Sequence, residues 1–425
     1  MKRKILTIAV VVLLALGVLA VLNRDRLFHP PKPIRLGVLH SLTGPMAISE
    51  KPLVDAELLA IEQINAAGGL LGRPLEAVVA DGASDWPTFA REAERLINTE
   101  DVSAIIGCWT SACRKHVKTV VEQTGHLLIY PMAYEGLEVS PNIVYTGAAP
   151  NQQIFPALKW SLDNLGRRVF LVGSDYVWPH SVNEIIRDQI AALRGEIVGE
   201  EYVFFGSQDV DDTVARIRAT KPDVVISTVV GDSNFAFYRG LRQAGLDARE
   251  TPVVSLSIGE SELRALNALD VAGHYSAWSY FQSLRRPENQ AFVQRFRARY
   301  GSERVTSDVV ETAYFSVLLW AKAVEQAGVP DVQQVSELIL GESIDAPEGV
   351  VTVDAATRHT WRSFHVGQIR PDGQIDIVWS AEHPIRPVPY PRTRSRMDWD
   401  SFLLQLYKGW GNSWANPVPP VRTPR

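Results

Sequence analysis

The stretch VSAIIGCWTSACRKHVKTVVEQTGHLLIYP, residues 102–131, contains the repeating unit from which this chain is built. A short apolar run comes first, a turn follows at 107–111, apolar residues then recur at helical spacing over 112–123, and a second apolar run closes the stretch. This order predicts a βαβ unit with two parallel strands in one sheet. Because a parallel sheet has helices on both faces, the stretch indicates an α/β fold.

The same alternation extends in both directions along the chain of 425 residues. One set of short strands and amphipathic helices fills 34–147, and a second set fills 148–278, which predicts two doubly wound lobes. Beyond Gly273 come three helical stretches and then the strand-like runs WRSFHVGQI and QIDIVWS. These must complete the lobes, so we predict lobe 1 from 34–147 with about 279–346, and lobe 2 from 148–278 with about 347–385.

The two ends of the chain differ from this pattern. Residues 1–33 form a signal or anchor segment with a linker, since the basic residues KRK precede an uncharged apolar run over 5–22. The run reaches the roughly 17–25 residues that span a bilayer. We expect an uncleaved anchor in the inner membrane, the alternative being a cleaved signal with a mature start near Val21. Either puts the protein outside the cytoplasm, in the periplasm.

The C-terminal tail is rich in proline and tryptophan. From Ala381 to Arg425 it carries eight of the 26 Pro and three of the 11 Trp. Proline at this density disfavours helix and sheet, so we predict an extended surface strap over 386–425.

Composition and motifs exclude several functional classes. The formal charge of −5 gives no basis for nucleic-acid binding. The sequence contains no G-x-S-x-G elbow, P-loop, H-E-x-x-H motif or G-x-G-x-x-G after a strand, so we expect neither an enzyme nor a cofactor or metal site. Four residues separate the only two cysteines, Cys108 and Cys113. Zinc needs more ligands, and a disulfide is awkward in a strand-to-helix turn, so we predict two buried thiols.

The loops after the predicted strands share a composition. They are rich in hydroxyl and aromatic residues, modest in charge, and gather at the carboxyl edge of each sheet, where ligands of open α/β folds bind: HSLTG, GCWTSACRK, YPMAYEG, GSDYVWP, VVGDS and SLSIGE. This is the make-up of a pocket for a small, largely neutral polar ligand. Ser111 stands directly before a predicted helix, where it either caps the helix, contacts the ligand, or does both.

Five of these motifs carry a resemblance to a known family. LGVLHSLTGPMAISE, GCWTSACRK, YPMAYEGLEVSPNIVYTGAAPNQQ, GSDYVWP and ISTVVG resemble the urea and short-chain-amide substrate-binding proteins of ABC transporters, and the related amide sensor that regulates aliphatic amidase expression. The likeness runs from about Ile34 to Trp399. It implies a type I periplasmic-binding-protein fold, with two lobes that are joined by three crossovers and close over the ligand.

The resemblance also implies where the ligand binds. With the neighbouring loop residues, the candidate ligand-binding set is Trp109, Ser111, Tyr130, Met132, Ala133, Tyr134, Glu135, Tyr176, Trp178, Val230 and Gly231. Three of them depart from the amide sensor: Trp109 and Trp178 stand where it has Tyr, and Met132 where it has a hydroxyl residue. The urea binders also have Trp at the position of Trp109. Together, the three departures imply a smaller or more apolar cleft.

The favoured function is therefore capture of urea or a short-chain aliphatic amide outside the cytoplasm and delivery to an ABC permease. Two alternatives remain open. One is a membrane-anchored amide or urea receptor that signals to a partner, and the other is a protein that binds branched-chain amino acids. The amino-acid ligand would need a fixed countercharge for its ammonium group and donors for its carboxylate.

Overall fold

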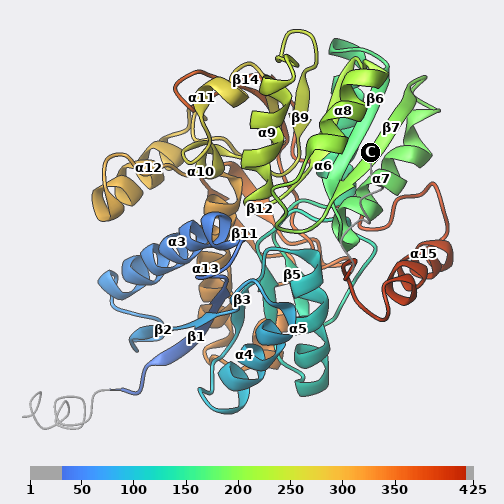
Figure 1. Ribbon diagram of the computed structural model, residues 1–425. Coiled ribbons are helices and arrows are strands. Elements are labelled where there is room, and N and C mark those ends of the chain that lie inside the picture. The colour runs from blue at the N-terminus through green and yellow to red at the C-terminus, as the bar shows by residue number, and fades with distance from the viewer. Residues whose placement is uncertain (1–30, 418–425) are drawn as a thin grey trace, which may run out of the picture.

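The computed structural model describes residues 31–417, and these form two lobes, one above the other in Figure 1. The predicted export segment lies largely outside the described residues. Within residues 31–417, no helix has the length and apolar character needed to cross a membrane.

Lobe 1 is built on a five-stranded parallel sheet with the strand order β2-β1-β3-β4-β5. Its first part contains β1 (Ile34–His40), α3 (Ala47–Ala66), β2 (Leu75–Asp81), α4 (Trp86–Asn98), β3 (Ile105–Gly107), α5 (Ser111–Thr124), β4 (Leu128–Tyr130) and β5 (Ile143–Tyr145). A later part of the chain packs α13 against α3 and β3, and comprises α12 (Pro287–Tyr300), α13 (Asp308–Ala327), α14 (Val332–Leu338), β11 (Ser343–Ala346) and β12 (Gly349–Thr352).

Lobe 2 is built on a seven-stranded sheet with the order β14-β13-β10-β9-β8-β6-β7. Its elements are α6 (Pro150–Asn164), β6 (Arg168–Ser174), α7 (Val177–Ile190), β7 (Glu196–Val203), α8 (Asp211–Thr220), β8 (Val224–Thr228), α9 (Ser233–Gln243), β9 (Val253–Ser255), α10 (Glu260–Leu263), α11 (Ala268–Val271), β10 (Tyr275–Trp278), β13 (His365–Ile369) and β14 (Ile375–Ser380). The chain thus passes between the lobes three times, after β5, β10 and β12.

The two-lobed α/β architecture is confirmed, with one difference in strand direction. The predicted runs around 365–380 form β13 and β14. Strand β13 pairs antiparallel with β10, and β14 pairs antiparallel with β13. An antiparallel edge on a mostly parallel sheet is common, because two adjacent strands need only a short connection. The residue boundaries given above for the lobes stay a prediction.

Apolar side chains explain why these segments pair as they do. The strands of the five-stranded sheet in lobe 1 are buried almost throughout, apart from the edge strand β2. The residue at 107 must be glycine, because an added Cβ would lie 2.1 Å from the carbonyl oxygen of Leu39 on the neighbouring strand. The close approach ends β3 and starts the turn that leads to α5.

The prediction of an extended strap is wrong for part of the C-terminal tail. Residues Arg396–Gly409 form helix α15, which packs against α7 (Figure 1). The helix starts at a capping box, in which the Ser395 hydroxyl accepts from the Asp398 amide and the Asp398 carboxylate accepts from the Ser395 amide, each at 3.2 Å.

Candidate functional site

The turn between β3 and α5 is held by a disulfide between Cys108 and Cys113, whose Cα atoms are 5.7 Å apart. The prediction of two free thiols is therefore wrong. Cys108 has a positive φ of 67°, and this left-handed backbone turns the chain so that the two sulfur atoms meet. The disulfide encloses Trp109, Thr110 and Ser111 in a small ring at the carboxyl edge of the sheet.

Thr110, and not Ser111, caps helix α5. Its side chain accepts a hydrogen bond of 3.1 Å from the backbone amide of Cys113. The capping role considered for Ser111 is therefore wrong. Ser111 is the first residue of the helix, and its hydroxyl donates instead to the carboxylate of Glu135.

Ser111 belongs to a buried network of charged groups. Arg114 lies one turn further along α5 and donates to the Ser111 hydroxyl over 3.0 Å and to Glu135 over 2.8 Å. It also donates to Glu138 over 3.0 Å, and Lys115 donates to the other oxygen of Glu138 over 3.3 Å. Lys118 also lies 3.6 Å from Glu138 and pairs with Glu122 at 3.8 Å. With this pair the network holds three cations and three carboxylates, so its formal charges cancel.

Opposite charges offset the effect of burial on the pKa values of Arg114 and Glu138. Burial alone would lower the pKa of Arg114, but Glu135 and Glu138 raise it well above its ordinary value. Burial would likewise raise the pKa of Glu138, but Arg114 and Lys115 hold it well below the usual carboxyl range. Charges that are paired and hydrogen-bonded in this way are the form in which ions occur in protein interiors.

Aromatic side chains from both lobes converge on this network. In lobe 1, the Tyr130 hydroxyl donates to the Trp109 carbonyl over 2.6 Å, and the Arg114 guanidinium stands 4.9 Å from the Tyr130 ring centre. In lobe 2, Tyr176 is buried, and its ring packs 6.4 Å from Trp178 and 5.6 Å from Phe205. Burial raises the pKa of Tyr176 well above its ordinary value. Helix α7, which starts directly after Tyr176, contacts α5 of lobe 1.

The remaining predicted residues occupy different positions. Tyr134 contacts the network through its ring, whose centre lies 4.2 Å from the Arg114 guanidinium. The same ring stacks on Tyr145 at 5.2 Å, and its hydroxyl meets His359. Met132 and Ala133 follow β4, and their backbone lies close to Gly147. A Cβ added to Gly147 would be 2.0 Å from the carbonyl carbon of Met132. These residues are buried, and the contacts described for them are with lobe 1 itself.

The loop after β8 meets lobe 1 directly. Within lobe 2, the loop is held by the Val230 amide, which donates to the hydroxyl of Ser174 at the end of β6 over 3.1 Å. Gly231 has a φ of 60°, and an added Cβ would lie 2.9 Å from the carbonyl oxygen of Pro45 in the loop after β1. The two lobes are therefore in direct contact here, and α5 also contacts α7. Trp178 lies in the first turn of α7, which begins at Val177.

Of the charged residues at this site, only Glu135 was predicted from the sequence. Arg114, Lys115 and Glu138 were not singled out. A usable signal was present, because Arg114 follows Ser111 by three residues and so lies on the same face of the helix.

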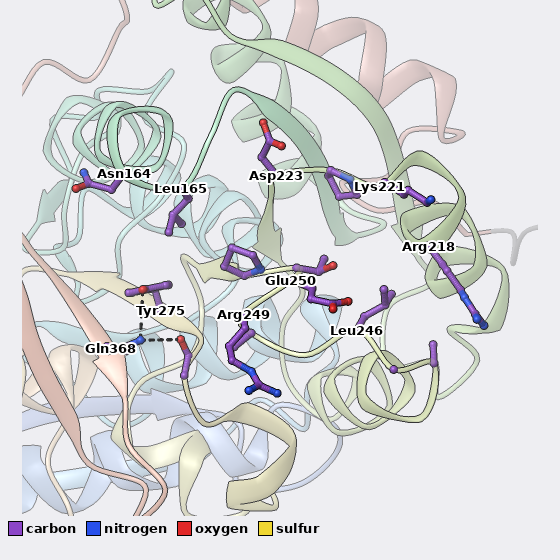
Figure 2. Close-up of a pocket in the computed structure, with 17 residues that line it drawn as sticks. Asn164, Leu165, Arg218, Lys221, Asp223, Leu246, Arg249, Glu250, Tyr275 and Gln368 are labelled. Carbon is purple, nitrogen blue, oxygen red and sulfur yellow. Dashed lines mark hydrogen bonds between the residues drawn. The ribbon is translucent and has the colours of Figure 1, made fainter.

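A surface groove lies at the opposite edge of lobe 2 and includes none of the predicted residues. It has a volume of about 940 Å³ and lies next to the amino ends of β8, β9 and β10. Figure 2 shows Gln368 in this groove, where its amide donates to the Tyr275 hydroxyl over 3.3 Å. The residues of the candidate site lie away from this groove, at the boundary between the lobes.

Comparison with known proteins agrees with this architecture. The chain is 24% identical over 330 residues to the leucine-, isoleucine-, valine-, threonine- and alanine-binding protein of Pseudomonas aeruginosa, covering 76% of this chain and 86% of the relative. It is also 38% identical over 118 residues to a limonene hydroxylase of Geobacillus stearothermophilus, but that match covers 28% of this chain and spans only 22% of the relative.

Two solved structures illustrate the shared fold. One is a solute-binding protein of an ABC transporter from Rhodopseudomonas palustris BisB5 in complex with 3,4-dihydroxybenzoic acid, with a TM-score of 0.76, 21% identity, and coverage of 83% of this chain and 98% of that one. The other is the branched-chain amino acid transporter substrate-binding protein LivJ of Streptococcus pneumoniae in complex with isoleucine, with a TM-score of 0.73, 21% identity, and coverage of 82% and 100%.

A family model for the periplasmic binding protein domain matches residues 34–396, which include both sheets and every candidate site residue. This chain belongs to the periplasmic binding protein family.

Proposed function

We propose that this protein is the extracytoplasmic solute-binding component of an ABC transporter, and that its ligand is urea or a short-chain aliphatic amide. The ligand is held between Trp109, Ser111 and Tyr130 of lobe 1 and Tyr176 of lobe 2. It is released to a permease when the lobes separate.

The charge balance at the lobe boundary is the observation that carries this proposal. Arg114 and Lys115 are paired with Glu135 and Glu138, and each charge has its partner within the protein. A charged ligand group would therefore find no uncompensated charge in this network. A neutral amide needs only hydrogen bonds and aromatic walls, which Ser111 and the tyrosine hydroxyls supply.

A second candidate is a branched-chain amino acid, which the relatives named above favour. One residue of this chain supports it. Glu260 stands at the start of α10, shortly after β9, and is buried, with one oxygen accepting from the Gln282 amide at 2.6 Å. Its other oxygen has no hydrogen-bond partner among residues 31–417. Burial raises the pKa of Glu260 to about 8, and an entering ammonium group would ionise this carboxyl and pair with it.

A calorimetric and thermal-shift panel separates the candidates. It contains urea, acetamide, butyramide, leucine, isoleucine and 3,4-dihydroxybenzoate. We expect binding of urea or acetamide and none of leucine, isoleucine or the aromatic acid. Because very small ligands gain at most about 1.5 kcal/mol per non-hydrogen atom, the ceiling for urea is about 6 kcal/mol, a Kd of tens of micromolar. Binding of leucine or isoleucine with no response to either amide overturns the proposal.

A variant makes the distinction sharper. If an amino acid binds, Glu260→Gln removes its countercharge, and affinity for leucine falls while proton release on binding disappears. Calorimetry in two buffers of different ionisation enthalpy measures that release. If an amide is the ligand, Glu260→Gln leaves its affinity unchanged, and Ser111→Ala lowers it.

A further inference from the structure

The C-terminal segment 389–416, most of which lies beyond the family match, contacts Tyr176 of the candidate site. The match ends at residue 396, and α15 with the residues that follow it comes after. The segment leaves lobe 1 where the Leu137 amide donates to the Pro389 carbonyl over 2.8 Å. It then reaches lobe 2, where Arg394 pairs with Asp188 of α7 at 2.6 Å. Figure 1 shows α15 beside α7, on the outside of the lobe.

The anchoring of this segment on lobe 2 is extensive. The Trp399 side chain is fully buried, and its indole donates to the Pro391 carbonyl over 3.0 Å. Trp414 accepts a bond of 2.9 Å through its carbonyl from the amide of Val177, the first residue of α7. That amide has no partner within its own helix, so the segment completes the end of α7.

The next two residues continue the pairing along the predicted ligand wall. Ala415 forms an antiparallel bridge with Tyr176. The side-chain amide of Asn416 donates to the Asp175 carboxylate over 2.8 Å, and the backbone amide of Asn416 donates to the Asp175 carbonyl over 3.2 Å. The segment is thus bound to the backbone that carries Tyr176.

After α15, the same segment contacts lobe 1 again through the Trp414 side chain. The Trp414 ring centre lies 4.5 Å from the Lys115 ammonium, a cation–π contact. Lys115 pairs with Glu138, Glu138 with Arg114, and Arg114 with the Ser111 hydroxyl. A single run of contacts therefore connects the ligand wall of lobe 1 to Trp414, whose backbone is fixed to lobe 2.

We propose that residues Trp410–Asn416 form a latch that holds the two lobes closed over the ligand, and that the Lys115–Trp414 contact is the one that breaks when the lobes open. Backbone hydrogen bonds to Val177 and Asp175 and the bridge to Tyr176 keep the latch on lobe 2, whereas its Trp414 ring reaches α5 through a cation–π contact with the buried Lys115. The latch requires a ligand between the lobes, as the proposed function does, but not a particular ligand.

The test uses the full chain with Trp414→Ala and a matched control, Trp379→Ala. Trp379 lies on β14, is 41% exposed, and belongs to neither the latch nor the candidate site. Stopped-flow fluorescence measures acetamide dissociation, and small-angle scattering measures the radius of gyration without ligand. Loss of a cation–π contact predicts dissociation about 5- to 30-fold faster in Trp414→Ala than in Trp379→Ala. The ligand-free Trp414→Ala chain is also larger than wild type.

A double-mutant cycle guards against a general loss of folding. If the contact acts as proposed, Trp414→Ala has little further effect in a Lys115→Met background. Equal dissociation rates and equal radii for Trp414→Ala and Trp379→Ala overturn the latch. If wild type does not bind acetamide, the proposed function fails, while the scattering comparison still decides whether Trp414 holds the lobes together.

Discussion

The hydroxyl of Tyr130, at the end of β4, donates a hydrogen bond of 2.6 Å to the backbone carbonyl of Trp109, in the turn after β3. Both residues are buried. The bond joins the carboxyl ends of two neighbouring strands and holds the backbone of the turn that carries Trp109. A phenol acts here as a support for the turn, in addition to any contact with a ligand.

Tyr130→Phe tests this support. The substitution removes the donor and leaves the Trp109 carbonyl buried without a partner, so we expect a loss of about 1–3 kcal/mol in the free energy of unfolding. Urea denaturation measures it. The control is Tyr275→Phe in the surface groove of lobe 2, where the hydroxyl is only partly buried and a smaller loss is expected. Equal losses in the two variants would contradict a special role for the Tyr130 bond.

The disulfide should order the same turn. Replacing both cysteines, as Cys108→Ala with Cys113→Ala, frees a short loop, for which chain entropy predicts a stability loss of about 2 kcal/mol. We also expect weaker ligand binding, because Trp109 and Ser111 must then be ordered on binding. Calorimetry under oxidising and reducing conditions checks this: reductant should weaken binding in wild type but not in the double variant. Wild-type affinity in the variant would show that the disulfide has no effect on the site.

A buried cluster near the crossovers predicts a pH dependence of stability. Arg362 pairs with Asp308, Glu311 and Glu348, and donates over 2.6 Å to the Thr146 carbonyl after β5. Burial raises the pKa of Glu348 to about 7, against the opposing charge of Arg362. Between the ordinary carboxyl pKa and pH 7, the folded protein keeps a proton that the unfolded chain loses. Stability therefore falls as pH rises, by up to about 1.4 kcal/mol per pH unit from this group.

Glu348→Gln removes this contribution. Urea denaturation at several values between pH 5 and pH 8 measures the free energy of unfolding. This free energy should decline less steeply with pH in the variant than in wild type, so the variant's relative stability should be greatest near pH 8. Glu260 and Glu262 have pKa values raised in the same direction, so some decline remains. An unchanged slope in Glu348→Gln would mean that Glu348 does not hold the proton.

The alternation of strands and helices made the two-lobed fold predictable from the sequence, because each element has a clear apolar period. The capping residue was not predictable, since Thr110 and Ser111 are both good caps and only the backbone of the turn decides between them. The disulfide depended on the positive φ of Cys108, which a sequence pattern for a non-glycine residue does not reveal.

Helix α15 was missed for a different reason. Proline was counted over the whole tail, but the eight prolines fall within 384–391 and 417–424, and the stretch between them contains none. The Ser395 and Asp398 pair at the start of that stretch is a capping signal that could have been used. The charged network around Arg114 was hidden because Glu135 and Glu138 come from another loop, and only the fold brings them to α5.

Trp109→Ala and Ser111→Ala together test the ligand site. Ser111 does not cap α5, so Ser111→Ala should not lose the stability of a cap. It removes a hydroxyl that lies between Arg114 and Glu135, and leaves a bound amide without this partner. Affinity for acetamide should then fall by about 1–3 kcal/mol, about 5- to 150-fold.

Trp109→Ala should act differently, because it replaces a wall by a cavity. Affinity for urea and acetamide falls, while butyramide, which fills part of the new space, loses less. Calorimetry with the three ligands on both variants measures the two effects, and thermal unfolding of each variant controls for loss of fold. If both variants keep the affinity and the ligand preference of wild type, the disulfide-bound turn is a structural element and the ligand binds elsewhere along the lobe boundary.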